Sequence, residues 1–290
     1  MKLIECVPNF SEGTNEKVIK EILDVFRNSD VKLLDKTYDK EYNRLVVTIV
    51  GDAERVKEAV LKASDVAISK IDMRKHRGSH PRIGAVDVVP FVPLKNTTMG
   101  ECIALSREFA RELSEKHNLP VFLYEKSATS PERRDIDFLR KGEFEGLLEA
   151  LKERKPDLGP EKPHKTAGAT IIGAREIMVG LNVNLSTSDL EVAKKIAKAI
   201  HSKSGGLMYV KAMATPWKGI TQIGMSNTNF KKTPVYRQFE LIKKETQRYN
   251  VQIVSSEFCG LVPIETMIDV LRYYLKLEDF SMEKIIELNL

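Results

Sequence analysis

The order of helical and strand-like segments repeats within this chain, and the repeat limits the folds that the chain can adopt. Early in the sequence, apolar side chains recur at helical spacing in a segment that begins near Thr14, and Val-rich or alternating segments indicate strands around it. The predicted order is βαββαβ, with strands at residues 2–9, 31–35, 44–50 and 85–92 and helices at residues 14–27 and 53–70.

The second half of the chain has the same order of elements. Strands are predicted at residues 177–185, 208–214, 220–225 and 251–256, and helices at residues 188–203 and 233–249. Thr233 and Pro234 are expected to cap the second of these helices. Asn9 and Asn184 occupy similar places near the end of the first strand of each repeat. We therefore predict an α+β fold of two similar ferredoxin-like βαββαβ subdomains, each an α/β sandwich, produced by internal duplication.

The segment between the repeats contains further elements. Thr98 and Glu101 have the spacing of a capping box, and we expect a strand at residues 120–126 and a helix at residues 136–154. Residues 155–169 hold three prolines and two glycines, which is typical of a connector between domains. This predicts a first domain at residues 1–167, connector included, and a second at residues 168–290. Ligands often bind in a groove between two domains, and a connector can contact them there, although a plain linker has the same composition.

Composition and charge narrow the classes of function. A length of 290 residues leaves room for two domains, and the net charge of +5 is scattered rather than gathered in one block. An acidic small molecule therefore fits better than duplex DNA. The three cysteines form no CxxC pair, and the chain has neither an export signal nor an apolar run of the roughly 20 residues that span a bilayer. We expect a soluble protein of a reducing cytoplasm.

Two histidines lie four residues apart in the stretch "KHRGSHPR". Gly78 and Pro81 oppose a helix that would bring both rings to one face, and no carboxylate stands between them, so no metal site is predicted. His76 follows a predicted helix and is expected to cap its carbonyls. His80 precedes a proline that stiffens the chain, and an imidazole with a pKa of about 6.5 suits proton transfer. Spacing alone does not decide between a structural and a catalytic role.

A polar cluster in "LLDKTYDKEYNR" lies at the ends of two predicted strands. It fits a solvated hairpin turn, but it also fits a site in which Asp35 orients a base or a substrate amine.

Several segments, in this order, resemble the glutamate formiminotransferase family, which includes the transferase part of formiminotransferase-cyclodeaminase. The segments include "LIECVPNFSEG", "IDMRKHRGSHPRIGAVDVVPFVPL", "GATIIGAREIMVGLNVNL" and "SSEFCGLVP", and the match spans nearly the whole chain. The resemblance implies a cytoplasmic, homodimeric enzyme of histidine degradation. It would transfer the formimino group of N-formimino-L-glutamate to the co-substrate tetrahydrofolate, giving 5-formimidoyltetrahydrofolate and L-glutamate. It also implies a folate groove between the subdomains. Since the sequence ends at Leu290 without a further helical domain, any cyclodeaminase step is expected on a separate protein.

The resemblance also assigns residues. The family's catalytic histidine falls on His80, as general acid and base. The folate-binding segment comprises Gly159, Pro160, Glu161, Lys162, Pro163, His164, Lys165, Thr166, Ala167 and Gly168. Supporting residues are Asn9, Ser11, Asp35, Asp39, Arg82 and Asn184. Thr37 stands where relatives usually have an aspartate, so one acidic group expected near the reaction is absent unless Asp39 replaces it.

Two other functions remain as alternatives. One is the same fold acting on a formyl group, from N-formylglutamate or 5-formyltetrahydrofolate, because the two groups differ by =NH and =O. The other is a non-catalytic folate- or RNA-binding protein. The strand sequences "RLVVTIVG" and "ITQIGMSN" lack the aromatic pattern of RNA-binding ferredoxin-like domains, which disfavours RNA.

Overall fold

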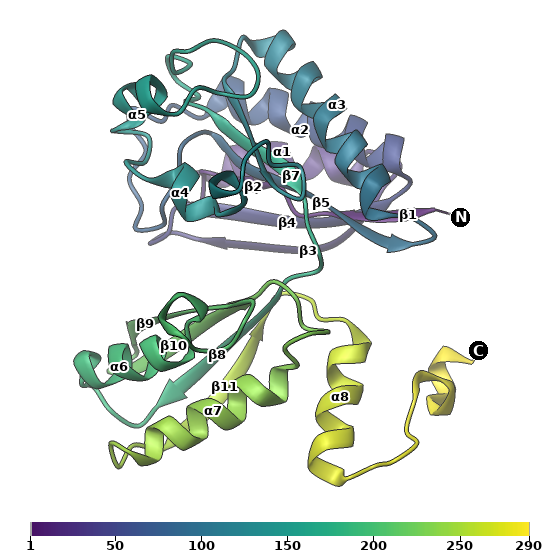
Figure 1. The fold of residues 1–290 in the computed structure, drawn as a ribbon. Helices are drawn as coiled ribbons and strands as arrows, with labels where there is room; N and C mark the ends of the chain where they lie inside the picture. Colours follow the sequence, from purple (N-terminus) through teal and green to yellow (C-terminus); the bar gives the residue numbers. More distant parts are fainter. Residues whose placement is uncertain (1, 290) are drawn as a thin grey trace. The chain divides into compact units, whose positions relative to one another are not determined.

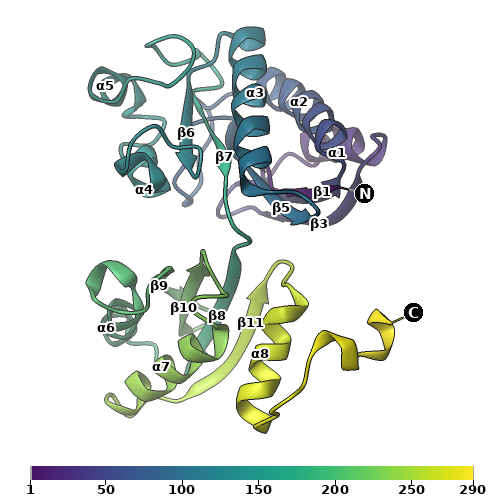
Figure 2. The same ribbon diagram turned by 45° about the vertical axis from the view of Figure 1, so that its right-hand side comes forward.

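The structure, a computed structural model, describes residues 2–289. Contacts divide the chain into two compact units, Met1–Glu176 and Ile177–Leu290, and each is described by itself. One stretch of chain links them in Figures 1 and 2. Every helix of the described residues is too short or too polar to cross a membrane.

The first unit begins with the predicted βαββαβ order. Its elements are β1 (Leu3–Cys6), β2 (Asn9–Phe10), α1 (Glu16–Arg27), β3 (Lys32–Asp39), β4 (Arg44–Gly51), α2 (Ala53–Lys70) and β5 (Val86–Lys95). β1 and β2 lie between β4 and β5, and β3 pairs with the other edge of β4, all antiparallel. This strand order confirms the ferredoxin-like prediction. The single strand predicted at residues 2–9 is broken at Val7 and Pro8, and β3 extends to Asp39, beyond the predicted Asp35.

Further elements enlarge this sheet. They are α3 (Met99–His117), β6 (Val121–Glu125), the 3-10 turn Glu132–Arg134, α4 (Ile136–Arg140), α5 (Leu147–Glu153) and β7 (Thr170–Ala174). β7 pairs in parallel with β5 and β6, which gives a sheet of seven strands within the described residues. The capping box of Thr98 and Glu101 is confirmed. The single helix predicted at residues 136–154 is wrong: Gly142 and Glu143 have φ of +89° and +53°, which ends α4 before α5 begins.

Residues 155–169 fold against the first unit at both ends. The Val121 N–H donates to the Leu158 carbonyl, and the N–H groups of Met73 and Ala85 donate to the carbonyls of Thr166 and Ala167. β7 follows and completes the sheet of this unit, so the segment predicted to connect two domains lies inside the first one.

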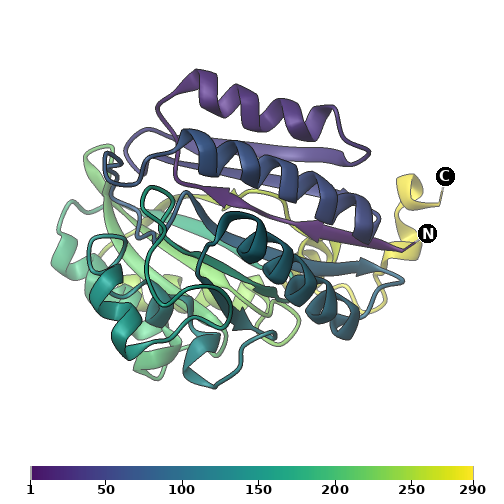
Figure 3. The same ribbon diagram turned by 90° about the horizontal axis from the view of Figure 1, so that it is seen from above.

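Helices cover the two faces of the first sheet unequally. α1, α2 and α3 pack on one face over a large apolar core that includes Phe26, Ile49 and Phe109, and they lie roughly parallel in Figure 3. α4 and α5 pack on the opposite face, against a smaller cluster around Phe122 and Ile171. This second face, beside α4, carries the residues described below.

The second unit repeats the order and the strand arrangement. Its elements are β8 (Val179–Leu185), α6 (Leu190–Ile200), the 3-10 turn Ser202–Ser204, β9 (Val210–Trp217), β10 (Ile220–Asn227), α7 (Val235–Gln247) and β11 (Ile253–Cys259). The antiparallel order is β11-β8-β10-β9, with α6 and α7 on one face (Figures 1 and 2). The predicted duplication is confirmed.

The helices at the end of the chain lie outside this repeat. α8 (Ile264–Leu275) packs beside α7, where the Tyr273 ring stacks on the Tyr236 ring with 4.2 Å between the ring centroids. Short 3-10 turns follow at Met282–Lys284 and Ile286–Leu288. The predicted cap of α7 is wrong. Pro234 occupies the N-cap position, and the Thr233 hydroxyl donates instead to the Met208 carbonyl at 2.6 Å.

Candidate active site

The loop after α2 that carries both histidines rests on the turn between β3 and β4. The Ser79 N–H donates to the Glu41 carbonyl at 3.0 Å, and the Asn43 side-chain amide donates to the Arg77 carbonyl at 2.8 Å. Gly78 approaches this turn so closely that an added Cβ would lie 2.3 Å from the Tyr42 carbonyl oxygen. The loop is therefore fixed by backbone contacts that require glycine at this point.

His76 uses both ring nitrogens inside the protein. The ring is buried, its Nε2 donates to the Asn43 carbonyl at 2.8 Å, and its Nδ1 accepts from Arg82 Nε at 3.2 Å. Burial lowers the pKa of His76, which keeps the ring neutral with the proton on Nε2. The predicted capping of the preceding helix is wrong, because the ring points to the β3–β4 turn. These contacts are those of a structural histidine.

Arg82 joins the same loop to the turn between α4 and α5. Its guanidinium is 6% exposed and donates twice to Glu145, at 2.9 and 2.7 Å, and once to Glu143 at 2.5 Å. The Arg82 carbonyl accepts from the Phe144 N–H at 2.9 Å. An open cavity of about 460 Å³ lies beside these side chains. Arg82 thus anchors the loop that carries His80 to the turn between α4 and α5.

His80 is half-buried and has a different hydrogen-bond pattern. Its Nδ1 donates to the Pro81 carbonyl at 2.8 Å, because a carbonyl oxygen accepts and cannot donate. Nε2 therefore carries the lone pair of the neutral ring. The Tyr42 ring packs against the imidazole edge-on, at 6.1 Å between centroids. Burial, followed by the charges of Arg44 and Arg140, lowers the pKa of His80 to about 4. The ring is neutral at pH 7 and can accept a proton at Nε2.

A buried charge cluster, whose members influence the pKa of His80, surrounds Asp87. Asp87 Oδ2 accepts from Arg44 at 2.9 Å and from Arg140 at 2.5 Å, and its Oδ1 accepts from the Ile83 N–H at 2.9 Å. Asp87 is fully buried at a β-bulge, where β5 has one more residue than β2. Burial alone would raise the pKa of Asp87, but the two arginines and the N–H lower it to about 2.

Two members of this cluster were absent from the sequence-based candidates. Asp87 had a visible signal, since a carboxylate inside the Val-rich strand "AVDVVPFV" must find a charged partner when buried. Nothing in the sequence singles out Arg140, because it is one of 46 basic residues. It lies on α4, distant in sequence from Asp87 and Arg44. Arg44 follows Asn43 in the polar cluster already noted.

Asn9 and Ser11 support these elements from the first strand. Asn9 accepts from Arg44 Nε at 3.1 Å and so orients that guanidinium. The buried Ser11 hydroxyl donates to the Gly84 carbonyl at 2.7 Å and fixes the chain after His80. Gly84 itself touches the end of the predicted folate segment, since an added Cβ would lie 2.6 Å from the Ala167 carbonyl oxygen.

The predicted acidic residues lie on β3 at varying distance from the cluster. Asp39 ends the strand, pairs in register with Arg44, and accepts from the Tyr42 N–H at 2.7 Å. Asp35 is half-buried opposite Thr48, and Thr37 is exposed opposite Val46. Asp39 is therefore nearer in the sheet to the cluster than Asp35 is.

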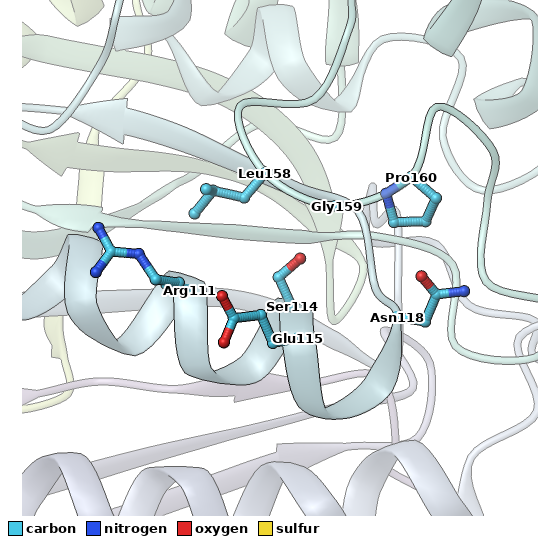
Figure 4. Close-up of a pocket in the computed structure, with 7 residues that line it drawn as sticks. All are labelled: Arg111, Ser114, Glu115, Asn118, Leu158, Gly159 and Pro160. Carbon is cyan, nitrogen blue, oxygen red and sulfur yellow. The ribbon is translucent and has the colours of Figure 1, made fainter.

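The segment Gly159–Gly168 forms a partly exposed loop with fixed ends. Gly159 and Pro160 line a cavity of about 290 Å³ with the end of α3, where Arg111, Ser114, Glu115 and Asn118 contribute (Figure 4). At the other end, His164 and Gly168 exchange backbone hydrogen bonds of 2.9 and 3.1 Å. Lys162 and Lys165 are exposed between these ends.

Asn184 belongs to the second unit. It lies on β8 with its amide on the sheet face opposite α6 and α7, where it donates to Ser255 Oγ at 2.9 Å and accepts from Gln222 at 2.9 Å.

Comparison with known proteins adds to this geometry. Residues 3–175 match the family model for the formiminotransferase domain, N-terminal subdomain, and residues 180–289 match that for the formiminotransferase domain. The chain belongs to the formiminotransferase family. A glutamate formimidoyltransferase of Streptococcus pyogenes serotype M1 is 45% identical over 98% of this chain and 96% of its own, and one of Thermoplasma acidophilum is 46% identical over 99% and 97%.

Some formiminotransferase relatives are longer. A formimidoyltransferase-cyclodeaminase of Dictyostelium discoideum is 38% identical over 100% of this chain and 56% of its own length. The two family matches end and begin on either side of Glu176, where the contacts divide the chain. The two compact units thus correspond to the two formiminotransferase subdomains.

Proposed function

We propose that this chain transfers the formimino group of N-formimino-L-glutamate to tetrahydrofolate, giving 5-formimidoyltetrahydrofolate and L-glutamate. The relatives named glutamate formimidoyltransferase match it over nearly their whole length, which supports the same reaction here. The observation that carries the proposal is the state of His80: a neutral ring, fixed by the Pro81 carbonyl, with its lone pair on Nε2.

His80 is the general acid and base of the proposed reaction. Tetrahydrofolate, as co-substrate, supplies the accepting nitrogen. That nitrogen must lose a proton when it bonds to the formimino carbon, and the glutamate nitrogen must gain one when its bond to that carbon breaks. His80 Nε2 takes the first proton and returns one to the leaving nitrogen, a contribution of about 10²- to 10⁴-fold. His76 cannot share this work, since both of its nitrogens are already bonded.

We assign folate binding to Gly159–Gly168. The fit rests on a partly exposed loop whose fixed ends reach the α3 cavity and the chain after His80. Lys162 and Lys165 are exposed on this loop and suit the carboxylates of the folate glutamyl group. Asp39, Asn9 and Ser11 support the reaction by holding the Tyr42 turn, Arg44 and the chain after His80. Asn184, whose Oδ1 accepts from Gln222, stays a candidate supporting residue on the second unit.

The test compares the two histidines. His80→Ala should lose most turnover of formiminoglutamate with tetrahydrofolate, while the binding of folinic acid, followed by fluorescence, is retained. His76→Gln should be much milder, because the Gln amide can still donate to the Asn43 carbonyl. Circular dichroism verifies that both variants fold. A larger loss of turnover in folded His76→Gln than in His80→Ala would contradict the assignment.

Two further arms test the donor and the assembly. N-formylglutamate, assayed in parallel, should turn over more slowly than formiminoglutamate, and inactivity with both donors would contradict the proposed enzyme. We also propose a homodimer, and sedimentation of the purified chain measures its mass.

A further inference from the structure

The helix α8 has two faces that can pack, and the second unit covers one of them. On the covered face, Thr266 is buried, Val270 packs against the core of the unit, and the Tyr273 ring stacks on Tyr236 of α7. The other face carries large apolar side chains at positions i, i+3, i+7 and i+11, which we call the outer stripe: Ile264, Met267, Leu271 and Leu275. This spacing is typical of a helix that packs against a further element.

The outer stripe stays exposed in the folded chain. Ile264, Met267, Leu271 and Leu275 are 38%, 39%, 40% and 62% exposed. The 3-10 turn Met282–Lys284 packs beside α8 without covering them, and Met282 itself is 41% exposed. In Figures 1 and 2, α8 lies at the margin of the second unit. Large apolar side chains that are exposed on successive turns of one helix indicate an interaction surface, whereas single exposed residues do not.

The charges along α8 indicate which partner fits the outer stripe. Glu265 and Asp269 lie in its N-terminal half, and Arg272 and the C-cap Lys276 lie in its C-terminal half. Each acidic residue precedes a basic one by seven positions, so all four lie along the same side of the helix. A second α8 that runs antiparallel sets the acidic half of each copy against the basic half of the other, whereas a parallel copy sets like charges together. The surface is therefore complementary to itself across a two-fold axis, as an isologous interface requires.

We propose that the outer stripe is a homodimer interface, in which the α8 helices of two copies of this chain pack antiparallel across a two-fold axis. This inference rests on the homodimer proposed above and names its surface. Leu271 lies near the middle of the stripe and therefore close to the axis. The stripe supplies the apolar centre of an interface of roughly 800 Å² per partner, and the charged side chains form its polar rim.

The first experiment measures the dissociation constant of the dimer by sedimentation equilibrium of the intact chain over a range of concentrations. Leu271→Asp places a charge in the apolar centre twice per dimer and should raise Kd at least about 100-fold. Leu148→Asp is the matched control. Leu148 is a 57% exposed leucine on α5, in the first unit, so its substitution should leave Kd unchanged. Circular dichroism verifies that both variants fold.

The second experiment tests the antiparallel pairing by exchanging charges. Asp269 and Arg272 are used because Glu265 already pairs with Lys231 at 3.0 Å. Asp269→Lys and Arg272→Glu should each raise Kd about 10-fold, because like charges then face each other across the axis. In an equimolar mixture of the two variants, with one carrying a fluorescent label, each new charge meets an opposite one. The mixed dimer should therefore regain a Kd near the wild-type value.

The outcomes separate this inference from the proposals on which it builds. A wild-type chain that stays monomeric overturns the homodimer and leaves the outer stripe to a different protein. A wild-type dimer whose Kd is the same in folded Leu271→Asp overturns the α8 interface alone, as does a mixture that dissociates as readily as the separate variants. Neither experiment uses turnover, so inactivity with both donors would contradict the proposed reaction and leave the measured masses unchanged.

Discussion

Arg82 offers a quantitative test of how the loop that carries His80 is held. Replacing it by Met removes two hydrogen bonds to Glu145, one to Glu143 and one to His76. The carboxylates are 41% and 54% exposed, so water replaces the guanidinium there, and the bidentate pair should contribute about 1–2 kcal/mol. His76 Nδ1 is buried and would lose its donor at a cost of about 1–3 kcal/mol. Together, Arg82→Met should destabilise the first unit by about 2–5 kcal/mol.

A double-mutant cycle isolates the Arg82–Glu145 pair. The cycle uses Arg82→Met, Glu145→Gln and both together, and the coupling free energy should be about 1–2 kcal/mol. Lys152 and Glu149 provide the control pair. Their N–O distance is similar, at 2.8 Å, but their side chains are 66% and 72% exposed, so their coupling should stay below about 0.5 kcal/mol.

The assay must report on each unit separately, and the sequence provides the probes. Cys6 and Cys102 are buried in the first unit, so their labelling by a thiol reagent in increasing urea follows its unfolding. Trp217 lies on β9, and its fluorescence follows the second unit. The reasoning is refuted if the Arg82–Glu145 coupling is no larger than that of the control pair. It is also refuted if Arg82→Met shifts the Trp217 transition while leaving the thiol transition in place.

Two further predictions use the same probes. Gly84→Ala should destabilise the first unit by at least about 2 kcal/mol, because the added Cβ would lie 2.0 Å from a backbone oxygen. Gly100→Ala on α3 is the control and should be neutral or stabilising, because the nearest atom to its added Cβ lies at 3.9 Å. Equal effects of the two substitutions on urea unfolding would contradict this prediction. The folded pKa of His80, about 4, lies below the unfolded value of about 6.5. The unfolded chain therefore binds a proton first, and the stability of the first unit should fall between pH 6.5 and 4. His80→Gln should flatten this decline, and an unchanged pH profile would speak against the lowered pKa.

The fold was predictable because its signals are local. Helical spacing, Val-rich strands and the capping box at Thr98 each depend on residues close in sequence, and the repeated order then fixes the architecture. The errors arose where tertiary contacts override local signals. The predicted helix breaks at Gly142 because the Phe144 N–H in the following turn donates to the Arg82 carbonyl. Thr233 does not cap α7 because its hydroxyl donates to the Met208 carbonyl.

The site was predictable only in part, for the same physical reason. Spacing within "KHRGSHPR" treats its histidines alike, but their hydrogen-bond partners differ. His76 donates to the Asn43 carbonyl and accepts from Arg82, so both of its ring nitrogens are bonded. His80 donates from Nδ1 to the Pro81 carbonyl, so its Nε2 remains an acceptor. The identity of those partners follows from how β4 and the loop approach each other, which a short motif does not encode.

The two units of the duplicated fold differ in the charge that they carry at matching strands. In each unit, an asparagine on the first strand accepts a hydrogen bond from the third strand. Asn184 on β8 accepts from Gln222 of β10, which is a neutral pair, whereas Asn9 on β2 accepts from Arg44 of β4. The charge at Arg44 then requires Asp87, whose second guanidinium comes from Arg140, outside the repeat. The two units therefore share the strand arrangement. Arg140, which lies between the repeats, adds a positive charge in the first unit.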